Sequence, residues 1–181
     1  MLFRSAMDAA SGALKPHGAP IKLRWRPVHN SVDQAGEFLL VAYNEPSGVS
    51  VHRINADGTI GDEVAQTEKL DVGVYGHQVT VTPGNNSLIL VTRGNNAAGS
   101  RPEDPGSLKV YGFNKGALTM KASVQPGTGH GFGARNSGIG RRLPSCVVTA
   151  PSSRACSFAS ERNASASSLA FARRSSAVWR A

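Results

Sequence analysis

The feature that most constrains the fold is an internal repeat. Residues 27–32 resemble residues 75–80, and the histidines of these two segments, His29 and His77, are 48 positions apart. Each segment is followed by turn residues and then by an apolar run. A second motif, in which Gly is followed by a small residue and then Leu or Ile, occurs three times, at 11–14, 57–60 and 115–118. A unit of about 48 residues with four short strands has the size of one β-propeller blade.

Short runs with strand character alternate with turn residues along residues 1–136. Residues 36–43 are apolar and aromatic, whereas residues 48–54 alternate between the two faces of a strand. No segment of ten or more residues shows the 3.6-residue periodicity of a capped amphipathic helix, and residues 93–106 are too polar for a strand. We predict an all-β fold with one blade at 28–32, 37–43, 48–54 and 59–69, a second at 77–82, 87–92, 107–113 and 117–125, and two strands of an earlier blade at 2–7 and 13–23.

The composition changes abruptly near residue 136. Residues 1–136 contain 13 Lys and Arg against 11 Asp and Glu, whereas residues 137–181 contain seven Arg and one acidic residue. We therefore divide the chain into a propeller part, 1–136, and an irregular Ser/Arg/Ala-rich tail, 137–181. A disordered basic tail, a weak helix at 164–174 and a shifted reading frame each fit this composition. We favour the shifted frame, because the change falls inside a motif.

The composition also argues against several classes of function. The net charge of +8 comes mainly from the tail, so we expect no nucleic-acid partner. There is no apolar run of about 18 residues and no secretory signal, which predicts a cytoplasmic protein without a membrane span. Cys146 and Cys156 do not have metal-ligand spacing, and the Gly-rich residues 127–131 lack the context of a phosphate loop. We expect no metal and no cofactor.

The order of the motifs resembles the seven-bladed β-propeller lactonase family. That family includes propeller-type 6-phosphogluconolactonases and fungal carboxy-cis,cis-muconate cyclases. Its blade pattern of Pro-x-His-x-x-Val, an Asp-x-x-Gly turn, Phe-Leu-Leu-Val-Ala and Asp-Gly-x-Leu is similar to residues 27–32, 33–36, 38–42 and 57–60, and residues 74–132 are more similar still. The resemblance implies a partial propeller of about two to three four-stranded antiparallel blades.

The same resemblance implies hydrolysis of a sugar-derived lactone, as in 6-phosphogluconolactonases, with a lactone or sugar phosphate as the partner. Ring opening needs an acid or base and a cation near the developing negative charge. We assign His77 as the general acid/base, because it starts an innermost strand; the alternative is a rim histidine that is hydrogen-bonded to the backbone. Arg135 matches the family arginine that is expected to bind a phosphate or carboxylate. Glu45 and Arg93 follow second-strand runs, where loops can bind substrate or simply carry solvated charges.

The remaining histidines are expected to be structural or solvent-facing. His29 occupies the place equivalent to His77 in the preceding blade, and we interpret it as structural. We expect His52 and His17 to face solvent, and assign no role to His130.

The resemblance ends at residue 136. Pro151 stands where the family has a Glu about sixteen residues after the arginine. We therefore expect an inactive fragment whose exposed blade edges favour aggregation or self-association. A muconate-cyclase-like lactonising enzyme, a non-catalytic propeller binding module and the product of a damaged gene remain alternatives.

Overall fold

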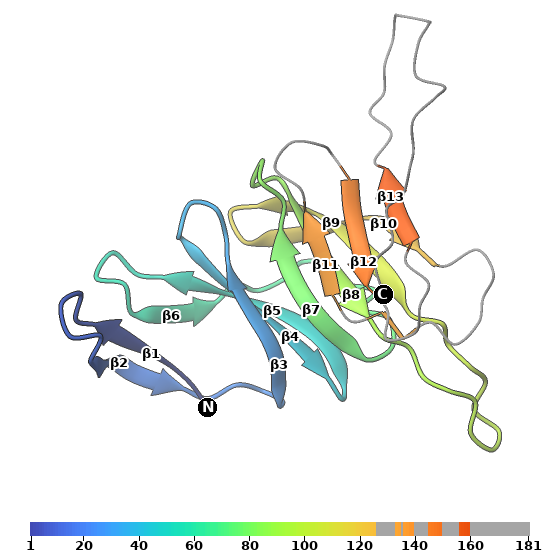
Figure 1. Ribbon diagram of the computed structural model, residues 1–181, viewed down its shortest axis with the longest axis horizontal. Helices are drawn as coiled ribbons and strands as arrows, with labels where there is room; N and C mark the ends of the chain where they lie inside the picture. The colour runs from blue at the N-terminus through green and yellow to red at the C-terminus, as the bar shows by residue number, and fades with distance from the viewer. Residues whose placement is uncertain (126–132, 135, 140–144, 150–155, 160–181) are drawn as a thin grey trace, which may run out of the picture.

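The computed structural model describes residues 1–125, 133–134, 136–139, 145–149 and 156–159, and the chain is drawn in Figure 1. These residues form strands, turns and loops, with no helix among them. None of them therefore belongs to a helix that is long and apolar enough to cross a membrane. The prediction of an all-β chain is confirmed for the part that the structure describes.

Two four-stranded antiparallel sheets form the centre of the molecule. In each sheet the strands follow one another in chain order, which is the arrangement of a propeller blade. The first blade contains β3 (Pro27–Val32), β4 (Phe38–Asn44), β5 (Ser47–Ile54) and β6 (Ile60–Glu63). The second contains β7 (Gly76–Val81), β8 (Ser87–Thr92), β9 (Ser107–Asn114) and β10 (Ala117–Val124). The strand predicted at 59–69 is shorter than expected, because its pairing with β5 ends at Glu63.

A hairpin and a small sheet flank the two blades (Figure 1). The hairpin contains β1 (Leu2–Met7) and β2 (Leu14–Ile21), as predicted for the end of an earlier blade. In the region predicted as an irregular tail, three short strands pair antiparallel: β11 (Asn136–Ile139), β12 (Ser145–Thr149) and β13 (Cys156–Ala159). The helix alternative at 164–174 and His130 lie outside the described residues.

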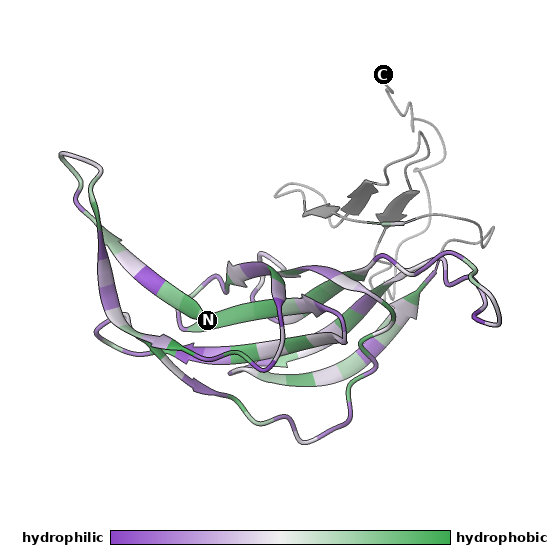
Figure 2. Cartoon of the chain, turned by 90° about the horizontal axis from the view of Figure 1, so that it is seen from below, coloured by the Kyte–Doolittle hydropathy of each residue, from purple (hydrophilic) through white to green (hydrophobic). Residues whose placement is uncertain are grey.

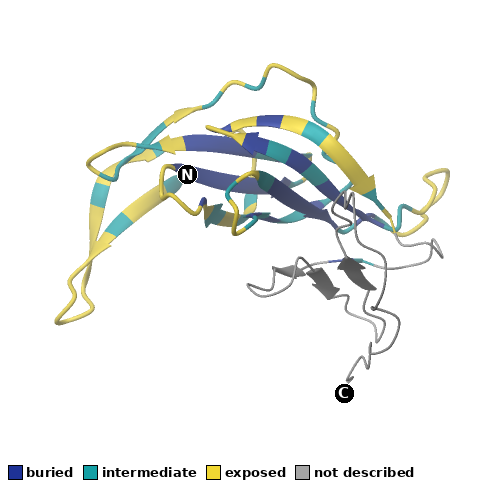
Figure 3. Cartoon of the chain, turned by 90° about the horizontal axis from the view of Figure 1, so that it is seen from above, coloured by how far each residue is buried: buried dark blue, intermediate teal, exposed yellow. Residues whose placement is uncertain are grey.

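The core forms where the two blades face each other. Side chains alternate between the two faces of a strand, so β4 contributes Leu40 and Ala42 to one face and Leu39, Val41 and Tyr43 to the other. The first face packs against Leu88, Leu90, Tyr111 and Phe113 of the second blade. The second face packs against Leu2 and Ile21 of the β1–β2 hairpin. Figure 2 shows the hydrophobic residues concentrated on the strands, and Figure 3 shows that burial decreases toward the hairpin.

The strand pairing sets the structural repeat at 49 positions rather than 48. In the first blade Pro27 pairs with Tyr43, and in the second Gly76 pairs with Thr92. Both differences, 76 − 27 and 92 − 43, are 49. Turn hydrogen bonds repeat at the same interval, from the N–H of residue 33 to the carbonyl of residue 38 and from 82 to 87.

This register corrects the predicted equivalence of the two histidines. His29 pairs with Ala42 and therefore corresponds to Gln78, which pairs with Val91. His77 instead lies in the irregularity between Gly76 and Gln78, where the first blade has Val28. Each inner strand thus contains one irregularly paired residue near its start, a position that re-aims a side chain.

Candidate functional site

Three of the predicted site residues come from segments that meet at one end of the two blades. Neighbouring strands are antiparallel, so the end of β4, the start of β7 and the end of β8 lie at the same end of the blades. Glu45 lies in the β4–β5 turn, His77 is the second residue of β7, and Arg93 directly follows β8. Glu45 is exposed, whereas His77 and Arg93 are half-buried. Arg135, the fourth predicted residue, lies outside the described residues.

Gly76 brings the second blade into contact with the first beside His77. Its N–H donates a hydrogen bond to Ser47 Oγ at 2.9 Å, two residues from Glu45. A Cβ at Gly76 would lie 2.5 Å from the carbonyl oxygen of Tyr43, which is closer than real Cβ contacts come. Only glycine therefore allows β7 to start this close to the β4–β5 turn.

Arg93 is stacked on Tyr75, two residues before His77. The Arg93 N–H donates to the Tyr75 carbonyl at 2.8 Å, and the Arg93 Cζ atom lies 4.4 Å from the centroid of the Tyr75 ring. The backbone of Tyr75 is in the left-handed region, with φ of 61°. A guanidinium that stacks on an aromatic ring keeps its planar edge of N–H donors, which suits a carboxylate or phosphate. The stack is thus a candidate anion-binding group beside the start of β7.

His29 lies at the interface between β3 and β7. The N–H of Val79 donates to His29 Nδ1 at 3.4 Å. Burial lowers the pKa of His29 from its usual 6.5, and the nearby His77 lowers it further. A ring nitrogen that accepts a backbone hydrogen bond carries no proton, so this contact and the lowered pKa both favour neutral His29. The contact gives His29 a role in packing the two blades together.

His52 is buried, which corrects the prediction that it faces solvent. Its side chain is 5% exposed, and its Nε2 lies 3.0 Å from Ser50 Oγ, which in turn lies 2.7 Å from the hydroxyl of Tyr43. Burial lowers the pKa of His52. Glu63 raises this pKa by a smaller amount, and Arg24 lowers it slightly. The alternating pattern misled the prediction because both faces of this blade are covered. His17, which was also predicted to face solvent, is half-buried, and its Nε2 contacts the carbonyl of Asp57 at 2.8 Å.

Sequence reasoning missed a polar cluster that lies beneath this end of the second blade. Lys109 in β9 is buried and contacts Asp71, and Tyr111 contacts the carbonyl of the same residue. The sequence did contain a sign of this cluster, because a lysine within the predicted strand 107–113 needs a polar partner if both faces of the strand are covered. Among the described residues, no group of three His, Cys, Asp or Glu side chains could hold a metal ion.

Comparison with known proteins gives one family and several similar solved structures. The family described as "Lactonase, 7-bladed beta-propeller" matches residues 3–137. A functionally unknown protein from Desulfotomaculum acetoxidans DSM 771 is 18% identical with a TM-score of 0.61, over 87% of this chain and 47% of that chain. The periplasmic gluconolactonase PpgL of Pseudomonas aeruginosa is 16% identical with a TM-score of 0.42, over 87% of this chain and 59% of that chain. The chain thus spans about half the length of these structures, and no curated protein matches it.

Proposed function

Because this chain belongs to the seven-bladed β-propeller lactonase family, we propose that it forms part of a site that opens the ring of a sugar-derived lactone. The observation that carries the proposal is the position of His77, half-buried at the start of an innermost strand and two residues from the Arg93–Tyr75 stack. A titratable imidazole and a guanidinium are thereby brought to the same end of the blades.

These groups match the needs of lactone hydrolysis. Water adds to the carbonyl carbon, the ring C–O bond breaks, and the products are a free hydroxyl group and a carboxylic acid, which releases its proton to solvent and becomes a carboxylate. A base accepts the proton of the attacking water, and an acid protonates the departing oxygen. We assign this proton transfer to His77, because an imidazole ring can both accept and donate a proton. Arg93 stabilises negative charge on the substrate, and Glu45 offers an acceptor for sugar hydroxyl groups.

The proposed substrate carries an acidic group, as 6-phosphogluconolactone does. A guanidinium binds phosphate or carboxylate through two parallel hydrogen bonds, and stacking on Tyr75 orders the Arg93 side chain before the substrate arrives. Arg135, which resembles the family arginine, is proposed as a second cation for the same group.

We further propose that this 181-residue chain binds such ligands without turning them over. The family pattern places a glutamate sixteen residues after the arginine, and Pro151 stands there instead. Without that carboxylate, the acid/base pair for ring opening is incomplete. Binding needs only the groups already present at the end of the two blades.

Calorimetry with gluconate and 6-phosphogluconate, together with a pH-stat assay of the corresponding δ-lactones, tests both proposals. We expect ligand affinity to weaken at least tenfold in Arg93→Ala. It should be unchanged in Arg101→Ala, because Arg101 is an exposed residue at the tip of the loop 93–106, which begins with Arg93. Hydrolysis should not exceed the spontaneous rate. Turnover that falls about 10²–10⁴-fold in His77→Ala would contradict the proposed inactivity and support the assignment of His77. If the chain shows neither ligand binding nor turnover, that result would contradict the proposed function.

A further inference from the structure

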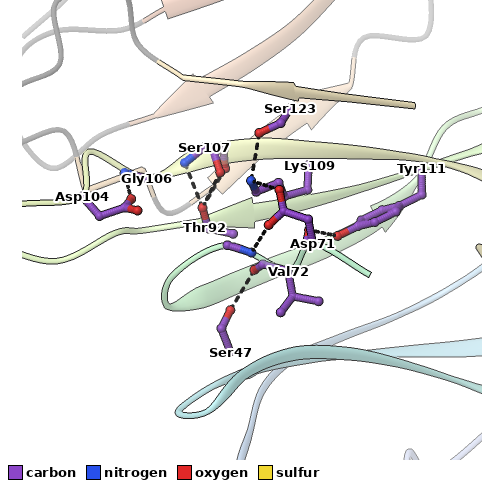
Figure 4. Close-up of polar contacts among 11 residues, drawn as sticks. Ser47, Asp71, Val72, Thr92, Asp104, Gly106, Ser107, Lys109, Tyr111 and Ser123 are labelled. Carbon is purple, nitrogen blue, oxygen red and sulfur yellow. Dashed lines mark hydrogen bonds and ion pairs between the residues drawn. The ribbon is translucent and has the colours of Figure 1, made fainter. Parts of the chain in front are cut away.

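Lys109 is a buried cation whose partner lies on the segment that connects the two blades. Its side chain is 7% exposed, and its Nζ lies 2.7 Å from Asp71 Oδ2 and 2.8 Å from Ser123 Oγ (Figure 4). Asp71 lies between β6 and β7, and its side chain is 56% exposed. The ion pair therefore joins the interior of the second blade to a connecting segment near its surface.

The first half of this segment is held by contacts with both blades. The Tyr111 hydroxyl donates to the Asp71 carbonyl at 2.6 Å, and the Ser47 hydroxyl of the first blade donates to the Val72 carbonyl at 2.9 Å. The N–H of Gly73 donates to Asp71 Oδ1 at 3.1 Å. A Cβ at Gly73 would lie 2.9 Å from Lys109 Cε, so the backbone rests directly on the lysine side chain.

The second half of the segment leads into the proposed site. Val74 and Tyr75 accept hydrogen bonds from the N–H groups of Gly94 and Arg93, and the Tyr75 ring then lies against the Arg93 guanidinium. Only three residues separate Asp71 from Tyr75, so a shift of the backbone at Asp71 would also move Tyr75 and its ring.

We propose that Lys109 is a positioning residue, which acts through Asp71 to hold residues 71–75 so that Tyr75 supports Arg93 beside His77. Lys109 does not contact the substrate. This role rests on the proposed function, in which Arg93 binds the acidic group of the ligand. A methionine would fill the same buried space without the cost of desolvating an ammonium group. It could not bind the Asp71 carboxylate, however, so the ion pair explains why a charged side chain is present.

The test is an NMR measurement of the stack in the free chain. A proton above a tyrosine ring is shifted upfield, so the δ-protons of Arg93 report the stack, and Tyr75→Leu gives the unstacked value. We expect Lys109→Met and Asp71→Asn to remove at least half of the upfield shift. Lys109→Arg should restore much of it, and Lys121→Met, which changes an exposed lysine of the same blade, should leave it unchanged. If the ordered stack falls to a tenth of the molecules, gluconate affinity should fall about tenfold.

An unchanged Arg93 shift in Lys109→Met and Asp71→Asn would overturn the proposal. If Lys109→Met does not fold, Asp71→Asn decides, since its side chain is half-exposed and asparagine has the same size. The ring shift is measured without ligand. A chain that shows the expected shifts but binds neither gluconate nor 6-phosphogluconate would therefore contradict only the proposed function.

Discussion

Asp33 links the turns of the two blades, and its removal should destabilise the chain measurably. Asp33 is 5% exposed and follows β3. Its Oδ1 accepts hydrogen bonds from the N–H groups of Glu37 and Phe38, both at 2.8 Å, and its Oδ2 accepts one from Ala35 at 3.2 Å. Across the interface, Oδ2 accepts a fourth from Asn85 Nδ2 at 2.9 Å. The turn and the blade interface therefore depend on one carboxylate.

We expect Asp33→Ala to lower the free energy of unfolding by about 2–3 kcal/mol. Hydrogen bonds to a charged group contribute about 1.5–3 kcal/mol each, but Ala35 and Glu37 are exposed residues, so water can replace the carboxylate at their N–H groups. Most of the loss therefore comes from the buried N–H of Phe38, and a smaller part comes from the half-buried Asn85. Asn85 has φ of 54°, so Asn85→Gly removes its side chain without adding backbone strain.

Urea unfolding of the two single variants and the double variant measures the coupling between the blades. The coupling energy should be about 0.5–1.5 kcal/mol, within the range found for residues in contact. Burial alone would raise the pKa of Asp33, but the hydrogen bonds from Asn85 and the backbone bring it below 3.8. The stabilisation is thus fully present above about pH 4 and is lost as the pH falls through the folded-state pKa. A cost below 0.5 kcal/mol, or an unchanged acid transition in Asp33→Ala, would refute the reasoning.

Three further predictions concern other parts of the chain. Gly76→Ala should lower the free energy of unfolding by about 1–3 kcal/mol, because its Cβ would clash with a carbonyl of the first blade. Gly84→Ala would make only ordinary contacts and should leave the thermal unfolding unchanged. Because burial lowers the pKa of His52, stability should fall as the pH drops below about 6.5, and His52→Gln should reduce this dependence in urea titrations at pH 5 and 8. Phe3 and Met7 are 67% and 68% exposed, so sedimentation should show self-association that weakens in a Phe3→Ser/Met7→Lys variant; a concentration-independent monomer would contradict this.

The sequence by itself determined most strands of the two blades, their turns and the order of the blades. Apolar runs and turn glycines act within a few positions of backbone, so strands such as Ser87–Thr92 are local properties. The repeated motifs then predicted the four-stranded unit, because similar local sequences form similar hairpins. His77, Arg93 and Glu45 could be proposed as site residues because each lies at the end of a recognisable strand.

The tertiary structure alone decided the register of the repeat, the burial of His52 and the partner of Lys109. The 49-residue register depends on hydrogen bonds between strands, and a local match of two histidines carries no information about them. His52 is buried because the first blade is covered on both faces, which the strand's own sequence does not encode. Lys109 and Asp71 are 38 positions apart and meet only when the connecting segment packs onto the second blade, so the burial that makes their ion pair necessary exists only in the folded chain.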